Sequence, residues 1–313
     1  MLRHVSALDQ LSIQDAWLTI GSFDGVHLGH QEIIHRLTAG AHRENSPAVV
    51  LTFYPHPATV LRSLQSAISL TLPDERAEIL EKQGVDVVIT LPFNTDFAAT
   101  SAQDFITSLK KATGFNHLLV GQDFALGHNR EGDVRRLGQW SERYGYQLVI
   151  IPPLVREGRV ISSSQIRVAL ADGEVETAAS LMGRPYQIEG SVVRGDGRGR
   201  RIGIPTANLR LHPDKLIPKL GVYACLAEIG GEQWAAATNI GVRPTFDGKS
   251  LAPQVEAHLL DFNADIYEQN VRLKFMAYLR EEQRFSSVEA LLEQIQTDIQ
   301  KTRLLVKPNI LVP

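Results

Sequence analysis

The stretch Gly21–His30 reads Gly-Ser-Phe-Asp-Gly-Val-His-Leu-Gly-His and directly follows the apolar run Ala16–Ile20. An apolar run that leads into a glycine-rich turn is typical of a parallel α/β sheet, in which ligands bind beyond the carboxyl ends of the strands. The glycines let backbone approach a ligand closely, and the imidazoles of His27 and His30 can donate hydrogen bonds to phosphoryl oxygens. The stretch therefore predicts a nucleotide-phosphate site. Two histidines that only pack at a helix start, or that bind a metal, are the alternative.

The rest of the first half alternates short β-branched runs with helical patterns, which predicts βαβ units and a mostly parallel sheet. The expected strands are Ala16–Ile20, Ala48–Phe53, Val85–Leu91, His117–Val120 and Gln147–Ile151. The expected helices are Gln31–Ala41, Asp74–Gln83, Ala102–Thr113 and Asp133–Tyr144, followed by two shorter ones, Ser164–Ala171 and Glu174–Leu181. Ser101 and Asp133 are candidate N-caps, and Asp172-Gly173 is a stop signal between the two short helices.

The pattern changes near Gly183-Arg184-Pro185, where strand-like runs separated by Gly and Pro turns begin. Runs such as Ile188–Val193, Val222–Ile229 and Val255–Leu260 predict antiparallel β structure in a small barrel. A helix from Ser286 or Ser287 to about Leu305 closes the chain, with one buried face expected at Leu291, Leu292, Ile295, Ile299 and, as a further candidate, Arg303. We expect two domains, residues 1–183 and 184–313.

Composition and net charge limit which binding partners and which cellular compartment we expect. With 313 residues, 43% hydrophobic and 21% charged, the chain has the balance of a globular protein, and its formal net charge of −3 predicts no nucleic-acid or membrane partner. The one cysteine, Cys225, lies in an apolar run where packing is its expected role, and it favours a reducing compartment. No apolar run approaches the roughly 20 residues of a membrane span. We therefore expect a cytoplasmic location, and we also expect a monomer or weak homo-oligomer.

A second anion-binding candidate is the stretch Ile161–Arg167, which reads Ile-Ser-Ser-Ser-Gln-Ile-Arg. It follows an expected strand and opens a helix, so hydroxyls and backbone N–H groups gather where an anion is favoured. Arg167 then adds a fixed cation in the first turn. Taken alone, a serine run before a helix indicates only an N-cap.

In the second half, Gly195–Asn208 reads Gly-Asp-Gly-Arg-Gly-Arg-Arg-Ile-Gly-Ile-Pro-Thr-Ala-Asn. Its glycine-rich arm can lay backbone N–H groups along phosphates. Thr206 offers a hydroxyl and Asn208 a carbonyl oxygen, both of the kind that Mg²⁺ prefers. Without further context, such a stretch is also compatible with an ordinary loop and turn, or with a nucleic-acid contact.

Two motif-like features are set aside. Gly248-Lys249-Ser250 is not a Walker A motif, because the glycine required earlier would fall at Arg243. The spacing Gly195-x-Gly197-x-Gly199 does not complete the dinucleotide fingerprint and follows no βαβ pattern.

The run Val255–Leu260 supplies a candidate general base. Strand alternation places Glu256 and His258 on one face and Val255, Ala257 and Leu259 on the other, and one face must be the barrel interior or mouth. A carboxylate there can accept the proton of an alcohol that attacks the γ-phosphate of ATP. A solvated strand glutamate is the alternative.

The motifs Gly21–His30, Phe53–Pro57, Val120–Phe124 and Ile161–Arg167 occur in an order that resembles the adenylyltransferase module of bacterial bifunctional riboflavin kinase/FMN adenylyltransferases, the prokaryotic FAD synthetases. Pro205-Thr206-Ala207-Asn208 resembles the flavokinase signature, so the resemblance covers nearly the whole chain. It implies a nucleotidyltransferase-like α/β domain that converts FMN to FAD with release of pyrophosphate, and a β-barrel domain that phosphorylates riboflavin to FMN. ATP is the expected co-substrate and Mg²⁺ the expected cofactor of both reactions.

The resemblance also implies roles for single residues. It makes His27, His30 and Glu256 catalytic, and Thr206 and Asn208 metal ligands. The implied nucleotide- and flavin-binding residues are Gly21, Phe23, Asp24, Gly29, Asp123, Ser163, Ser164, Arg167, Gly197, Gly199, Gly203, Pro205, Thr206 and Asn208.

The chain departs from the family pattern at two places. Ser164-Gln165 stands where Thr-Arg is more usual, and Met182 replaces a leucine. Loss of the basic residue at Gln165 leaves open how the triphosphate is held. The rival hypotheses are an adenylyltransferase for a pantetheine or nicotinamide phosphate, and a flavin-binding protein with weakened N-terminal activity.

Overall fold

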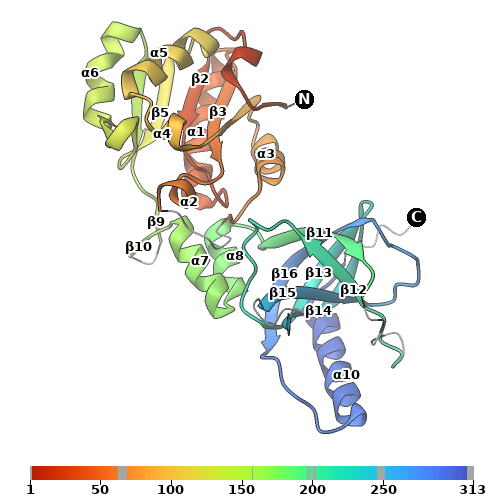
Figure 1. Ribbon diagram of the computed structural model, residues 1–313. Coiled ribbons are helices and arrows are strands. Elements are labelled where there is room, and N and C mark those ends of the chain that lie inside the picture. The colour runs from red at the N-terminus through yellow and green to blue at the C-terminus, as the bar shows by residue number, and fades with distance from the viewer. Residues whose placement is uncertain are drawn as a thin grey trace. The chain divides into compact units, whose positions relative to one another are not determined.

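The structure is a computed structural model that describes residues 2–62, 69–156, 158–195, 197, 199, 202–244 and 251–308 (Figure 1). Gly248-Lys249-Ser250 and part of the basic cluster at 194–201 lie outside these residues. Contacts divide the chain into two compact units, Met1–Ser163 and Ser164–Pro313. The expected division of activities at 183/184 stays a prediction.

The first unit is built on a six-stranded sheet in which every neighbouring pair is parallel. In spatial order its strands are β1 (Arg3–Val5), β4 (Val87–Pro92), β3 (Ala48–Tyr54), β2 (Trp17–Ile20), β5 (His117–Gly121) and β8 (Gln147–Ile151). The five strands expected from the sequence are confirmed within two residues at each end, and β1 is an additional edge strand.

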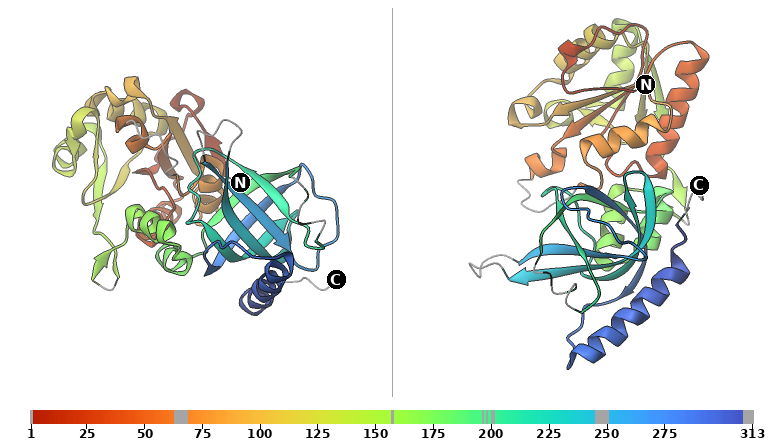
Figure 2. Two further views of the ribbon diagram at one scale, coloured as in Figure 1. Left: turned by 60° about the horizontal axis from the view of Figure 1, so that its bottom comes forward. Right: turned by 90° about the vertical axis from the view of Figure 1, so that its right-hand side faces the viewer.

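Helices cover both faces of this sheet, as Figures 1 and 2 show. On one face, α1 (Leu28–Arg43) and α3 (Pro73–Glu81) pack side chains such as Ile34, Leu37 and Leu80 against the strands. On the other, α5 (Ala102–Thr113) and α6 (Val134–Tyr144) bury Ile106 and Leu137. Short elements of this unit are η1 (Leu8–Gln10), α2 (Pro57–Leu61), α4 (Thr95–Ala98), β6 (Ala125–Leu126), η2 (His128–Arg130), β7 (Gly132–Asp133), β9 (Val155–Arg156) and β10 (Arg159–Val160).

Local signals place the starts of α5 and α6 as expected. The side chains of Ser101 and Asp133 accept hydrogen bonds from backbone N–H groups three residues ahead, which confirms both as N-caps. The strand order then locates the site. From β2 the chain proceeds to β3 on one side, whereas β5 lies on the other side of β2. This reversal makes the carboxyl ends of β2 and β5 the switch point where α/β sheets bind ligands.

The second unit is a closed six-stranded barrel, and every described strand pair is antiparallel. Around the barrel the strands are β11 (Gln187–Val193), β12 (Ala207–Leu211), β15 (Leu251–Leu259), β14 (Glu232–Pro244), β13 (Gly221–Ile229) and β16 (Asn270–Arg280). Its helices are α7 (Ser163–Asp172), α8 (Val175–Met182) and α10 (Val288–Leu305). The expected barrel and C-terminal helix are confirmed.

The long helix α10 packs on the outside of the barrel (Figure 2). It lies against a patch of alanines, Ala224, Ala235, Ala237 and Ala277, whose small side chains let helix and strands approach closely. The expectation that Arg303 belongs to the buried face is wrong: Arg303 is exposed, and Asp298 and Thr302 are buried instead. Arg303 pairs at the surface with Asp261.

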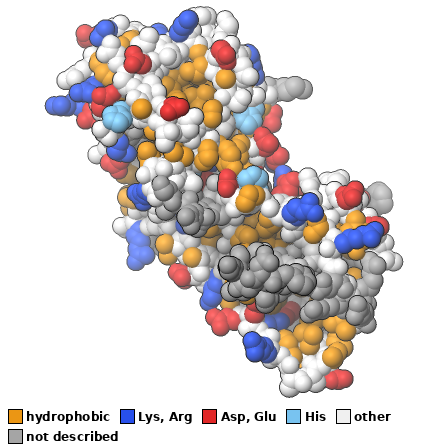
Figure 3. All heavy atoms as spheres, viewed as in Figure 1, with side chains coloured by type: hydrophobic (Ala, Val, Ile, Leu, Met, Phe, Trp, Pro, Cys, Tyr) orange, Lys and Arg blue, Asp and Glu red, His pale blue; other side chains and the backbone are white. Residues whose placement is uncertain are grey.

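Cys225 is fully buried in β13, as expected for a packing residue. Burial raises the pKa of its thiol to about 12, because the thiolate cannot be solvated there. No helix in the described ranges is long and apolar enough to cross a membrane. On the face drawn in Figure 3, acidic and basic side chains are interspersed, which fits the small net charge.

Candidate functional sites

The histidine turn lies at the carboxyl end of β2, where α1 begins. The helix starts at Leu28, three residues earlier than expected, and His27 is its N-cap. The His27 Nδ1 atom accepts a hydrogen bond from the backbone N–H of His30, 3.3 Å away. In the neutral ring this arrangement leaves the proton on Nε2, the nitrogen that can donate to a phosphoryl oxygen.

The two imidazoles form one unit. Their ring centroids are 3.6 Å apart with an interplanar angle of 18°, so the rings are stacked, and the Phe23 ring meets His30 edge-on. Gly29 makes this possible, because a Cβ there would lie 3.2 Å from atoms of the His27 ring. Gly29 thus leaves room for the histidine, and its contact with a ligand stays a prediction.

The backbone before His27 is strained. Phe23, Gly25 and Val26 have φ angles of 43°, 81° and 37°. A left-handed conformation costs a non-glycine residue on the order of 1–3 kcal/mol, most for a β-branched one such as valine, and persists only where the surroundings enforce it. Contacts with other segments of the chain must therefore hold the turn in this conformation.

Asp24 is one of the residues that hold the turn. Its carboxylate is fully buried and accepts hydrogen bonds from the backbone N–H groups of Leu70 and Thr71, at 3.1 and 3.0 Å. Its carbonyl oxygen accepts a hydrogen bond from the Ser163 hydroxyl, 2.9 Å away. The carboxylate therefore anchors the turn from behind, and direct contact of Asp24 with a nucleotide stays a prediction.

An aromatic cavity of about 550 Å³ opens at the carboxyl ends of the central strands. Its lining includes Ile20 at the end of β2, Phe53 at the end of β3, Phe93 after β4 and Phe124 after β5. The volume lies within the roughly 300–1,000 Å³ of small-molecule pockets, and such a lining suits a flat ring system. Asp123, next to Phe124, is exposed beside this cavity.

The serine-arginine motif opens α7. Ser163 is the first residue of the helix and ends the first unit. Ser164, which is exposed, and the partly buried Gln165 and Arg167 follow on the first turn of the same helix. The Ser163 hydroxyl is tied to the histidine turn by its hydrogen bond to the Asp24 carbonyl oxygen.

In the barrel, strand register brings three polar side chains side by side. Glu256 on β15 is paired with Asn208 on β12 and with Asn239 on β14. Directly paired residues share a face of a sheet, and the alternating Val255 and Ala257 are fully buried in the barrel interior. Glu256 and His258 therefore lie on the outer face; the barrel interior is apolar at this strand.

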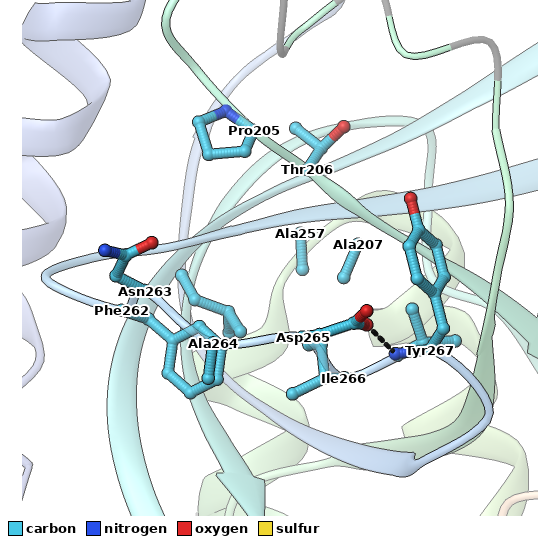
Figure 4. A pocket seen from close by; sticks show the side chains of 12 residues that line it. Pro205, Thr206, Ala207, Ala257, Phe262, Asn263, Ala264, Asp265, Ile266 and Tyr267 are labelled. Atoms are coloured by element: carbon cyan, nitrogen blue, oxygen red, sulfur yellow. Dashed lines mark hydrogen bonds between the residues drawn. The ribbon is translucent and has the colours of Figure 1, made fainter.

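Two cavities are lined by residues of this row, a third lies nearby, and Thr206 lines all three. The loop cavity, about 500 Å³, lies between Pro205 and Thr206 on one side and the loop 262–267 on the other (Figure 4). The polar cavity, about 220 Å³, is lined by Thr206, Asn208, Asn239 and Glu256. The helix cavity, about 340 Å³, lies between the barrel and α10 and is lined in part by apolar side chains such as Val222, Phe285 and Ile295.

Glu256 lines both the polar cavity and the helix cavity. Its carboxylate is 3.5 Å from the Thr206 hydroxyl, and the Asn208 amide oxygen accepts a hydrogen bond from Gln254, 2.6 Å away. A carboxylate at this junction can take a proton from a group in the apolar cavity while phosphate oxygens occupy the polar one.

The glycine arm contributes Gly197 and Gly199 to the polar cavity, whereas Gly203 lies in a turn outside the three cavities as described. A Cβ at Gly199 would lie 2.2 Å from the carbonyl oxygen of Ile204, so only glycine fits there. The Pro205 carbonyl is held by His258, whose Nδ1 lies 2.7 Å away.

Sequence reasoning missed several residues of these sites. Asn239 completes the polar row, and Arg280 lines the helix cavity while its guanidinium binds both carboxylate oxygens of buried Asp298 on α10. For Asn239 the sequence did hold a signal, because its side chain is the one amide within the largely apolar run 235–242. No local signal could pair Arg280 with Asp298, since the partners come from different elements.

The comparisons with known proteins agree with these two sites. Residues 9–165 match the family model described as FAD synthetase, and residues 182–306 match that described as riboflavin kinase. Proteins named bifunctional riboflavin kinase/FMN adenylyltransferase are similar over almost their whole length. That of Listeria monocytogenes is 36% identical and that of Pseudomonas fluorescens 38%, with 96% and 93% of each chain covered.

The chain belongs to the bifunctional riboflavin kinase/FMN adenylyltransferase family. The member of this family from Escherichia coli K12 is 37% identical over 300 residues, 95% of each chain. The family that the motifs indicated is thereby confirmed.

A solved structure from Streptococcus pneumoniae, described as a macrolide-efflux protein, has the same fold. It matches with a TM-score of 0.87 and 32% identity over 96% of this chain and 98% of that one. Its description concerns that protein, and the likeness supports the arrangement of strands and helices found in each unit.

Proposed function

We propose that the barrel unit transfers the γ-phosphoryl group of ATP to riboflavin, giving FMN, and that the first unit transfers the adenylyl group of a second ATP to FMN, giving FAD and pyrophosphate. The position of Glu256 at the junction of a polar and an apolar cavity carries the first half of this proposal. The stacked histidines at the switch point carry the second half.

In the kinase step, the isoalloxazine ring occupies the helix cavity and the ribityl chain reaches Glu256. Glu256 accepts the proton of the terminal hydroxyl as its oxygen attacks the γ-phosphorus, and the bond from that phosphorus to the bridging oxygen of ADP breaks. ATP approaches from the loop cavity, with its phosphates at Thr206. The volumes support this assignment, since about 340 and 500 Å³ suit organic ligands whereas about 220 Å³ suits phosphates and an ion.

The residues of the polar cavity fit Mg²⁺, which when bound neutralises oligophosphate charge. Thr206 and Asn208 offer a hydroxyl and an amide carbonyl, both hard oxygen donors. Mg²⁺ keeps waters and substrate phosphates as most of its ligands, so a site with few protein donors is sufficient. The described residues contain no cluster of three or more His, Cys, Asp or Glu side chains suited to a metal.

In the adenylyl-transfer step, a phosphate oxygen of FMN attacks the α-phosphorus of ATP and the bond to pyrophosphate breaks. The attacking oxygen is already anionic, so no protein nucleophile or base is required. His27 and His30 donate hydrogen bonds to phosphoryl oxygens as charge builds on them, and the aromatic cavity beside Phe53 and Phe124 receives the flavin ring. Ser163, Ser164 and Arg167 are proposed to hold the triphosphate.

The product assay tests both halves at once. The full chain is incubated with riboflavin, ATP and Mg²⁺, and the flavins are separated by chromatography; we expect FMN to appear first and FAD to follow. Flavin binding without turnover would favour a protein that has lost its chemistry. Adenylylation of a pantetheine or nicotinamide phosphate with no FAD would favour the rival adenylyltransferase. Cytoplasmic location, the lack of nucleic-acid or membrane partners and a monomer or weak homo-oligomer stay predictions.

A further inference from the structure

Arg76 on α3 is the largest fully buried side chain of the described residues and carries a charge that neither reaction uses directly. Its guanidinium lies 3.6 Å from the Asp24 carboxylate, and the two side chains are 2% and 0% exposed. Burial lowers the pKa of Arg76, while the nearby Asp24 opposes that shift. A buried guanidinium is disfavoured unless most of its N–H groups find acceptors, so its partners reveal what it holds together.

The partners of Arg76 come from two chain segments that flank the histidine turn. Nε donates to the Thr71 hydroxyl at 3.2 Å, and a terminal nitrogen donates to the Thr71 carbonyl at 2.9 Å. The other terminal nitrogen donates to the Thr52 hydroxyl at 2.7 Å, at the end of β3. One side chain therefore fixes the segment around Thr71 relative to the carboxyl end of the sheet.

Both threonines pass this restraint on to the turn. The Thr71 hydroxyl accepts from the Gly25 N–H at 3.0 Å and donates to the Asp24 carboxylate at 3.3 Å. The Thr52 hydroxyl donates to the Ser22 carbonyl at 2.8 Å. Residues 22, 24 and 25 are thus tied to Arg76 through single intermediates, directly beside the strained Phe23 and Val26.

We infer that Arg76 is a positioning residue for adenylyl transfer, which holds the strained turn so that His27 and His30 face the phosphates in one fixed geometry. This inference rests on the proposed role of the two histidines. Arg76 itself is too deeply buried to touch a substrate, so its effect passes through Thr71, Thr52 and Asp24. A preorganised set of donors is what lowers a charged transition state, and a displacement of about 1 Å can cost about 100-fold in rate.

The most direct variant is Arg76→Lys in the full chain. Lysine keeps the positive charge beside Asp24 but lacks the planar fork that reaches both threonines. We expect kcat for FAD formation from FMN to fall about 10- to 100-fold, with KM for ATP and FMN changed less than about threefold. The riboflavin kinase activity of the same sample should be unchanged, which gives an internal measure of protein concentration.

If Arg76→Lys does not fold, the variants Thr71→Val and Thr71→Ser still test the inference. Valine removes the hydroxyl that joins Arg76, Asp24 and Gly25, and serine retains it. We expect Thr71→Val to lower kcat about tenfold and Thr71→Ser to restore it. A threonine hydroxyl without a positioning role would leave the two variants equal in kcat per folded molecule, and this result would overturn the inference.

Leu137→Ala is the control for loss of stability alone, because Leu137 is buried on α6 at the opposite face of the sheet. It should lower the melting temperature of the first unit while kcat of the folded fraction stays at the wild-type value. If Arg76→Lys lowers activity only in proportion to the unfolded fraction, as this control does, Arg76 is merely structural.

The double variant separates this inference from the function on which it rests. If Arg76 acts through the histidine turn, Arg76→Lys added to His30→Ala should lower kcat little further than His30→Ala alone. If the double variant instead loses the product of the two separate fold-losses in kcat, the inference is contradicted, while the role of His30 stands. Should His30→Ala itself leave FAD formation unchanged, the proposed role of the histidines fails, whatever Arg76 does.

Discussion

His27 and His30 lie in a turn at the end of a parallel sheet, fixed from behind by a buried Arg–Asp pair and two threonines. Glu256 lies on the outer face of an antiparallel barrel, between strand neighbours whose positions follow from register alone, and α10 covers the cavity beside it. In the first site a strained loop needs a tertiary network to keep its shape. In the second, the regular hydrogen bonds of the barrel already place the polar row. Only the position of α10, which lines the helix cavity, depends on a tertiary contact, the Arg280–Asp298 ion pair.

This contrast suggests how each reaction can be disabled. The barrel site should depend on single side chains in the polar row, since the strands stay in place when one side chain is changed. The turn should be sensitive both to its histidines and to residues that never meet a substrate. The following changes test this contrast, beginning with the largest expected effect.

Replacement of the candidate base should abolish one reaction only. We expect Glu256→Gln to lower the rate of FMN formation from riboflavin about 100- to 10,000-fold, because the amide cannot accept the hydroxyl proton. FAD formation from supplied FMN should be unchanged. Glu232→Gln, an exposed glutamate on β14 of the same barrel, is the matched control. Equal loss of both reactions in Glu256→Gln would contradict the assignment of two separate sites.

Removal of a histidine should give the reciprocal result. His30→Ala should lower FAD formation about 100- to 1,000-fold through loss of a donor to the phosphoryl oxygens, and FMN should accumulate from riboflavin. His35→Ala, exposed on the same helix, should behave as wild type. Rates of FMN and FAD production measured in one reaction mixture decide between this outcome and a purely structural role.

The position of α10, which lines the helix cavity, should depend on the buried ion pair between Arg280 and Asp298. Asp298 is 3% exposed and accepts three hydrogen bonds from Arg280, so Asp298→Ala leaves Arg280 without its buried partner and should lower the free energy of unfolding by about 3–5 kcal/mol. KM for riboflavin should rise because α10 lines the helix cavity.

The exposed pair Arg303–Asp261 on the same helix is the comparison. Asp261→Ala should change stability by no more than about 1 kcal/mol, since solvent screens this pair. Urea unfolding followed by circular dichroism measures both variants. Equal destabilisation would show that burial does not distinguish the two pairs.

The smallest effect concerns pH. Burial raises the pKa of the Cys225 thiol from 9.0 to about 12, so the folded state keeps a proton that the unfolded state loses above pH 9. Stability contributed by the neutral thiol is complete below pH 9 and declines as pH rises toward 12, by up to about 1.4 kcal/mol per pH unit. Cys225→Ala should remove this slope. Unfolding free energies of both proteins between pH 8 and 10 test it, and parallel curves would contradict the prediction.

Most elements were predictable because their signals are local. The strands of the sheet, the caps at Ser101 and Asp133 and the alternation of Val255–Leu259 all follow from periodicity and from side chains that bond to nearby backbone. The start of α1 was placed three residues late, because histidine is an unusual N-cap and its Nδ1 contact with the His30 N–H leaves no common sequence pattern. Arg303 was assigned to the buried face since spacing alone cannot tell a buried position from a neighbouring one that finds a partner at the surface.

The candidate site residues were found from motifs, yet several have other immediate tasks than the motifs suggested. Gly29 makes room for the His27 ring, and Asp24 bonds to the segment around Thr71. Glu256 lies on the outer face of the barrel. The Asp24 contacts depend on neighbours 46 or more residues away, and the position of Glu256 depends on the closure of the barrel, which a short stretch of sequence does not contain. The role of Gly29 depends on the conformation of the turn, which brings the His27 ring against it.

By itself, the sequence determined the family, the two fold classes and the identity of the candidate catalytic residues, because each of these depends on local periodicity and on side-chain chemistry within short motifs. Only the tertiary structure decided which side chains meet: the stacked histidines, the row of Asn208, Glu256 and Asn239, and the pairs Arg76–Asp24 and Arg280–Asp298. The physical reason is that burial and strand register act across distant parts of the chain, and a buried charge is stable only where folding brings its partner.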